Sequence, residues 1–275
     1  MPAAVKSFSI GDFRCHAIDD GVSTYATASF LFASAPEPLR EKMLREAGED
    51  PDAIRCSNTC LLLETDGTRI LIDTGSGSLA GVRAGRENLG RLYAGLEAAG
   101  VAPQEIDIVI LTHLHSDHAW GCLGPDGRGP LFESARHVIA RTEWETMHPS
   151  VAEDLNRLES LVDLPEPDAE VVPGVRLRPA PGHSPGHCAV HVTSDGQELL
   201  CVGDAVAHWI NLEHPEWTMG HEDEPALAEA TRRRLLDQAV ADGMLVHAYH
   251  MPFPSLGRIH REGAGYAWEP ASMAG

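Results

Sequence analysis

The stretch His113-Leu114-His115-Ser116-Asp117-His118 places four potential metal ligands within six positions. It directly follows residues 106–111, an almost entirely apolar run that is typical of a strand covered on both faces. We therefore expect the cluster on the loop at the carboxyl end of that strand. Imidazole and carboxylate groups bind divalent cations well, and a loop can turn alternate residues toward one point. The first two histidines can then face one cation, and the last two members a second. A group of surface histidines at the start of a helix is the alternative interpretation.

Further donors are expected from elsewhere in the chain, because a cluster of four cannot complete the shells of two cations. His183 lies in the stretch 181–187, whose glycines and prolines predict a tight loop that suits a rigidly held ligand. Asp204 follows the apolar run 199–202, where a buried carboxylate is costly unless it meets a cation. His250, within Tyr-His-Met-Pro, is the third candidate. Taken singly, the three could instead be a loop histidine, a helix cap and a core histidine.

Two similar β-hairpins are predicted, each with an Asp-Gly turn between alternating or apolar runs. The first covers residues 59–72 and the second covers residues 189–202. An aspartate follows each hairpin in the chain, Asp73 after the first and Asp204 after the second. The repetition predicts two related β-rich halves with acidic groups at their strand ends.

Strands and helices alternate along residues 1–275 without a low-complexity linker, which predicts one layered α/β domain. Residues 1–55 are expected to contain a strand at 8–18 and a short helix that stops at Gly48. This segment can serve as a lid, a dimer contact or core packing, and the sequence does not choose among them. Further helices are expected at residues 87–99, 141–163 and 225–243.

The composition excludes several classes of partner. With 41 acidic and 21 basic residues, the formal net charge is −20, and such a field repels nucleic acid and acidic membranes. No apolar run reaches the roughly 20 residues that span a bilayer, and no export signal is recognisable, so a cytoplasmic location is expected. The triplet Arg232-Arg233-Arg234 is expected on a solvated face. Six cysteines without a Cys-x-x-Cys pair are expected to be buried thiols.

The order of these motifs resembles the metallo-β-lactamase superfamily over residues 57–257. The resemblance rests on the His-x-His-x-Asp-His run, the later Gly-His-Ser-Pro-Gly-His, the Gly-Asp, the distal histidine and the early Asp73-Thr-Gly turn. It implies a four-layer αββα sandwich with metals at one edge between the sheets. It further implies one cation held by His113, His115 and His183, a second held by Asp117, His118 and His250, and Asp204 bridging the two. Asp73 would orient a ligand histidine, unless it only forms the turn.

The resemblance also implies a chemistry. Two divalent cations, zinc first and manganese, iron or cobalt as alternatives, would lower the pKa of a shared water. The resulting hydroxide would attack a carbonyl or phosphorus, and Asp117 or Asp204 would carry the proton. The implied substrate is a small neutral ester, lactone or phosphotriester.

Within the superfamily, the lactonase and phosphotriesterase branch fits best. The β-lactamases usually lack the bridging aspartate and are exported, the nucleases need a further domain and a basic surface, and glyoxalase II carries a helical C-terminal region. Flavodiiron-type reductases have glutamate at the position of His115. The stretch from His250 to Gly257 is similar to the end of methyl parathion hydrolase. Ala207 stands where acyl-homoserine lactonases have a catalytic tyrosine, which counts against a close relation to those lactonases without excluding lactone hydrolysis. A lactonase of that specific type, a di-iron redox protein and a non-catalytic member of the fold are the alternatives.

Aromatic residues near the motifs can line a substrate pocket, although a tryptophan more often belongs to the core. The candidates are Trp120, Trp144, Trp209 and Phe253. A small-molecule substrate is the expected partner, and a homodimer is possible.

Overall fold

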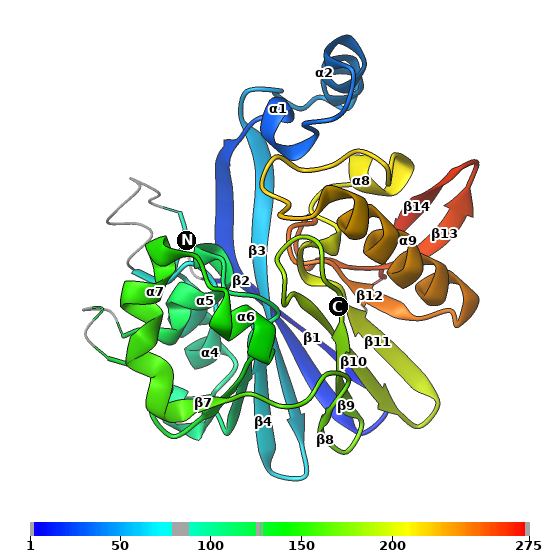
Figure 1. Ribbon diagram of the computed structural model, residues 1–275. Coiled ribbons are helices and arrows are strands. Elements are labelled where there is room, and N and C mark those ends of the chain that lie inside the picture. The colour runs from blue at the N-terminus through cyan, green and yellow to red at the C-terminus, as the bar shows by residue number, and fades with distance from the viewer. Residues whose placement is uncertain (1–2, 79–87, 125–126, 128, 273–275) are drawn as a thin grey trace.

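The computed structural model describes residues 3–78, 88–124, 127 and 129–272, and within them the strands form two seven-stranded sheets (Figure 1). The first sheet has the order β1 (Val5–Ile10), β2 (Phe13–Ala26), β3 (Ile54–Thr65), β4 (Thr68–Ile72), β5 (Ile108–Ile110), β6 (Arg136–Val138) and β7 (Val162–Asp163). The second has the order β14 (Gly265–Pro270), β13 (Leu256–Glu262), β12 (Leu245–His247), β11 (Gln197–Cys201), β10 (Cys188–Ser194), β9 (Val175–Pro179) and β8 (Glu170–Val172).

The alternation of side chains along each strand divides the apolar residues between two layers. On β3, Leu61 and Leu63 point into the core between the two sheets, while Leu62 points to the outer face. On β10, Val190 and Val192 share that central core. The two sheets therefore pack face to face through one apolar layer.

Helices cover both outer faces of this pair of sheets (Figure 1). The first sheet is covered by α4 (Leu92–Ala98), α7 (Pro149–Leu155) and neighbouring short helices, which supply Leu96 and Leu155 to its outer core. The second is covered by α8 (Ile210–Glu213) and α9 (Pro225–Ala241), which contribute Leu212 and Leu235. This arrangement confirms the predicted four-layer αββα sandwich.

Both Asp-Gly hairpins are confirmed, as β3–β4 and β10–β11. Asp66 and Gly67 have φ values of 43° and 77°, and Asp195 and Gly196 have φ values of 48° and 70°. Two consecutive residues with positive φ form the turn type that matches strand twist, which is why Asp-Gly marked both positions.

Three expectations about secondary structure were wrong in detail. The strand expected at residues 8–18 is a hairpin, because the chain turns back at Gly11 (φ 52°). The helix expected at 141–163 is interrupted: α6 (Arg141–Glu145) ends before a new helix begins at Pro149, as proline favours a first helical turn. Of the helix expected at 87–99, position 87 lies outside the described residues, and α4 begins at Leu92.

The N-terminal helices α1 (Ala28–Leu31) and α2 (Glu37–Glu46) extend from one end of β2 and β3 (Figure 1). Leu31, Phe32 and Leu44 are buried there with Ala207 and Ile210 of the second half. The segment thus contributes packing close to Asp204, and its suggested role as a lid or dimer contact stays a prediction.

Arg232 corrects the expectation that all three arginines of its triplet lie on a solvated face. It is fully buried on α9, forms an ion pair with Glu222 and donates to the carbonyl oxygens of Ala205 and Pro215. Among the described helices, none has both the length and the apolar character that crossing a membrane requires.

Candidate metal centre

The predicted loop lies where the sequence analysis placed it, at the carboxyl end of β5. His113 follows the strand, and α5 (Ser116–Ala119) begins after His115, so that His118 turns back into the protein. The hydroxyl of Tyr249 donates to the carbonyl oxygen of Asp117 at 2.6 Å and fixes the helix against the opposite half. Parallel neighbours deliver their loops to one edge of a sheet, which is why β4 brings Asp73 to the same place.

The first donor group consists of His113, His115, His183 and Asp204. The Nδ1 of His115 lies 3.0 Å from the Nε2 of His113 and 2.9 Å from the Nε2 of His183. The Oδ2 of Asp204 lies 3.3 Å from the same His183 nitrogen. Three imidazole nitrogens and one carboxylate oxygen therefore converge on one point.

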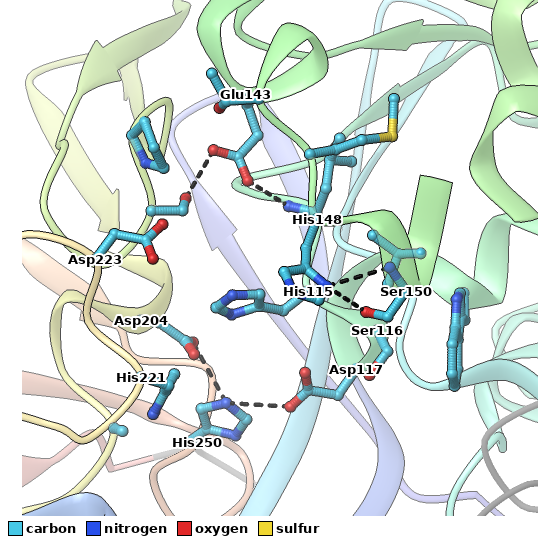
Figure 2. Close-up of a pocket in the computed structure, with 18 of the residues that line it drawn as sticks. His115, Ser116, Asp117, Glu143, His148, Ser150, Asp204, His221, Asp223 and His250 are labelled. Atoms are coloured by element: carbon cyan, nitrogen blue, oxygen red, sulfur yellow. Dashed lines mark hydrogen bonds and ion pairs between the residues drawn. The ribbon is translucent and has the colours of Figure 1, made fainter. Parts of the chain in front are cut away.

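The second donor group consists of Asp117, His118 and His250. The Nε2 of His250 lies 3.6 Å from the Oδ2 of Asp117 and 3.3 Å from the Oδ1 of Asp204. Figure 2 shows the ring of His250 with dashed lines to the carboxylates of Asp117 and Asp204. The Nε2 of His118 lies 3.0 Å from that same Asp204 oxygen. Asp204 therefore presents one oxygen to each donor group.

Hydrogen bonds outside the two groups orient their imidazole rings. The Nδ1 of His118 donates to Asp73 at 2.9 Å, and the Nδ1 of His250 donates to the carbonyl oxygen of Ser57 at 2.8 Å. With a proton held on Nδ1, each Nε2 points into the site and would offer its lone pair to a cation, which is how ligand histidines are usually oriented. His187 accepts the backbone N–H of Asp204 at 3.1 Å and helps to place that residue.

Two observations show that these residues fit bound cations. The Nε2 of His118 and the Oδ1 of Asp204 are buried and make no well-formed hydrogen bond within the described part of the chain, although they face each other. The Nδ1 of His115 faces two imidazole nitrogens at once, and one proton cannot satisfy both contacts. Burial lowers the pKa of His183 well below its ordinary value, and burial together with His118 and His115 does the same for His113. These are neutral imidazoles with lone pairs available to a metal.

A pocket of about 640 Å³ opens onto both donor groups. His115, Asp117, Asp204 and His250 line its floor (Figure 2). Apolar side chains form much of its walls, among them Ala26, Leu31, Leu114, Trp120, Met147, Val151 and Ala207. The size and lining suit a small molecule with an apolar part.

The four aromatic residues that were expected to line the pocket lie in three different places. Trp120 lines this pocket, but Trp144 packs against the core beneath the first sheet. Trp209 and Phe253 line a separate cavity between α8 and β14. Trp209 also donates its indole N–H to Glu49 at 2.7 Å.

Several polar residues of the pocket were not predicted from the sequence, among them His221 and Glu143. His221 lies on the loop before α9, stacks on Phe30 with ring centroids 4.6 Å apart, and has its ring 4.7 Å from that of His183. Glu143 is buried on α6, beside the loops that carry His115 and His183. Neither residue belongs to a recognisable motif, so only the tertiary arrangement could find them.

Comparison with known proteins identifies the family. The sequence model of the Metallo-beta-lactamase superfamily matches residues 53–250. The chain is 31% identical over 192 residues to an N-acyl homoserine lactonase of Bacillus cereus, an alignment that covers 63% of this chain and 73% of that protein. The chain therefore belongs to the metallo-beta-lactamase superfamily, and it is a metal-dependent hydrolase of that superfamily.

Solved structures share the fold across the whole chain. The dizinc quorum-quenching lactonase AidC, in complex with its product N-hexanoyl-L-homoserine, superposes with a TM-score of 0.92 at 22% identity and covers 99% of both chains. The hydrolase AbOPH superposes with a TM-score of 0.89 at 22% identity and covers 100% of both chains. At these identities the likeness shows the fold alone.

Proposed function

We propose that this protein is a two-cation lactonase that opens N-acyl homoserine lactones. The observation that carries the proposal is the placement of Asp204, which presents one carboxylate oxygen to each of two converging donor groups. Curated relatives that match 63% of this chain at 30–32% identity are N-acyl homoserine lactonases, which supports this substrate class.

The first donor group would hold one cation and the second donor group the other, with Asp204 shared between them. Nitrogen and oxygen donors suit zinc, and manganese, iron and cobalt fit the same set. When bound, such a pair of cations supplies Lewis acidity and lowers the pKa of water.

The residues of the chain divide the remaining tasks. Asp73 and the Ser57 carbonyl keep His118 and His250 in the tautomer that binds metal. Both oxygens of Asp204 face imidazoles, and its side chain is 4% exposed. The side chain of Asp117 also lines the pocket and is 13% exposed. Asp117 is therefore the better placed carboxylate to accept a proton from water and return it to the leaving alkoxide.

The pocket favours a neutral substrate that carries an apolar chain. Its walls on the side of α1 include Leu31 and Ala207, and its walls on the side of α6 and α7 include Met147 and Val151. An acyl chain can lie against either wall while the lactone carbonyl meets the polar floor. His221 also lines the pocket, and burial lowers its pKa to about 4, so its imidazole is neutral. The neutral ring can form a hydrogen bond with the amide or the lactone of the substrate.

Phosphotriester hydrolysis is the second candidate, suggested by the likeness of residues 250–257 to methyl parathion hydrolase. Of that stretch, His250 lines the pocket, whereas Phe253 and Pro254 line the separate cavity. The part of the chain that carries this likeness thus touches the candidate site at one residue only, which favours the lactone.

The test is a substrate panel on protein loaded with zinc. N-hexanoyl and N-decanoyl homoserine lactone are compared with an aryl ester and an aryl phosphotriester by continuous proton release or chromophore assay. We expect kcat/KM for the lactones to exceed that for the others by at least about tenfold. A preference for the phosphotriester would replace the proposal by the second candidate. Oxygen uptake that depends on iron, without hydrolysis, would reject both.

A further inference from the structure

Glu143 connects the two loops that carry the imidazoles of the first donor group. One of its oxygens accepts the backbone N–H of Leu114 at 2.9 Å. The other accepts the hydroxyl of Ser184 at 2.7 Å and the backbone N–H of Gly186 at 3.0 Å. Figure 2 shows the carboxylate between its partners at the wall of the pocket.

These partners belong to one donor group and not to the other. Leu114 separates His113 from His115, and Ser184 follows His183. None of the three hydrogen bonds reaches a residue adjacent to His118 or His250. A change at Glu143 should therefore act on the first donor group.

Glu143 is buried, and the loop that carries His183 packs tightly against it. The residue is only 4% exposed. A Cβ at Gly186 would lie 2.1 Å from the backbone nitrogen of Glu143, so the His183 loop presses directly on α6. A buried carboxylate with three donors directed at it holds both loops, because losing it leaves those donors unsatisfied.

We propose that Glu143 is a positioning residue for the cation of the first donor group, and this inference rests on the proposed two-cation centre. It sets the distance between the His113–His115 loop and the His183 loop, so that three imidazole nitrogens meet at one point. The cation of the second donor group depends on other contacts, above all the one from Asp73 to His118.

The experiment measures cation binding, not turnover. Wild type, Glu143→Gln and Ser184→Ala are equilibrated with a zinc-buffering chelator over a range of free zinc, and bound metal is counted by mass spectrometry. The same proteins are loaded with cobalt, whose absorption reports the geometry of each site. Asp20→Asn is the matched control, since Asp20 is also a buried carboxylate that accepts backbone N–H groups, from Ser76 and Leu92 at 2.9 Å, away from the first donor group.

Glu143→Gln should weaken one of the two zinc sites by about 10–100-fold and change one of the two cobalt spectra. Ser184→Ala, which removes a single donor, should do the same to a smaller degree and remains informative if Glu143→Gln folds poorly. Asp20→Asn should lose stability but bind both cations like wild type. Equal weakening of both sites, or no weakening in either Glu143→Gln or Ser184→Ala, would overturn the role of Glu143. If the wild type binds two cations but does not hydrolyse lactones, the proposed substrate is wrong, while the role of Glu143 in cation binding is unaffected.

Discussion

The Oδ1 of Asp204 lies 3.0 Å from the Nε2 of His118, while its Oδ2 lies 3.3 Å from the Nε2 of His183. A single carboxylate thus spans the two donor groups. Burial would raise the pKa of Asp204, but the nearby His250 and His118 hold it well below its ordinary value, so the group is an anion. An anion with two oxygens directed at different imidazole clusters is the arrangement expected of a bridge between cations.

The substitution Asp204→Asn should therefore cost both metal and rate. An amide keeps one oxygen but replaces the other by an NH₂ group, which cannot bind a cation. We expect bound metal to fall toward one per chain and kcat to fall by about 100-fold or more. Metal analysis and lactone hydrolysis measured on the same preparation check this. A variant with wild-type metal content and rate would show that Asp204 is no bridge.

Asp73 should matter to the second donor group more than to the first. It accepts from the Nδ1 of His118 directly, and it reaches His113 only through the hydroxyl of Thr112. Asp73→Asn is expected to weaken zinc binding by about 10–100-fold, with the larger effect at the second donor group. Zinc competition with a chelating dye measures it. The idea fails if Asp73→Asn changes only thermal stability, as a turn-forming aspartate would.

Cys188 is a packed thiol in spite of its place beside the centre. Burial, and then the charges of Glu143 and Asp73, raise its pKa far above the ordinary value, and its Sγ lies 3.4 Å from the carbonyl oxygen of Thr112. A buried thiol with a raised pKa is a poor nucleophile and a poor metal ligand, so we expect Cys188 to have a packing role only. Cys188→Ser should keep kcat/KM within about twofold of wild type. An inactive variant with intact folding would assign the thiol a direct role.

The buried ion pair between Arg232 and Glu222 should contribute to stability more than any exposed pair. Arg232→Ala leaves the Glu222 carboxylate buried without its cation, and breaking such a pair costs about 3–5 kcal/mol. Urea unfolding gives the difference. The control is Arg45→Ala, whose partner Glu41 lies one turn away on an exposed helix face and whose loss should cost about 0.5 kcal/mol at most. Equal effects of the two substitutions would contradict this view of Arg232.

The donors could be predicted from sequence because their signals are local. His113, His115 and His118 are close in the chain, and glycines, prolines or strand ends fix the backbone around His183 and Asp204. The two hairpins could also be predicted, since an Asp-Gly turn depends on residues that are adjacent in the chain.

The walls of the pocket and the buried charges could not be predicted in this way. The hydrogen-bond partners of Glu143 lie 29 and 41 residues away in the chain. Arg232 is likewise buried by contacts with other segments, which include Glu222 and the carbonyl oxygens of Ala205 and Pro215. Trp209 lies near Asp204 in sequence, but its side chain turns away from the pocket toward Glu49. Proximity in sequence indicates a shared backbone segment and does not fix the direction of a side chain.

Hydrolysis should require two cations that are shared among seven residues. Counting bound metal and measuring lactone turnover on one sample, while a chelator is titrated into it, tests this requirement. We predict about two cations per chain at full rate, a rate that falls to background as they are removed, and recovery when zinc is restored. Undiminished turnover by protein that has been freed of metal would contradict the account.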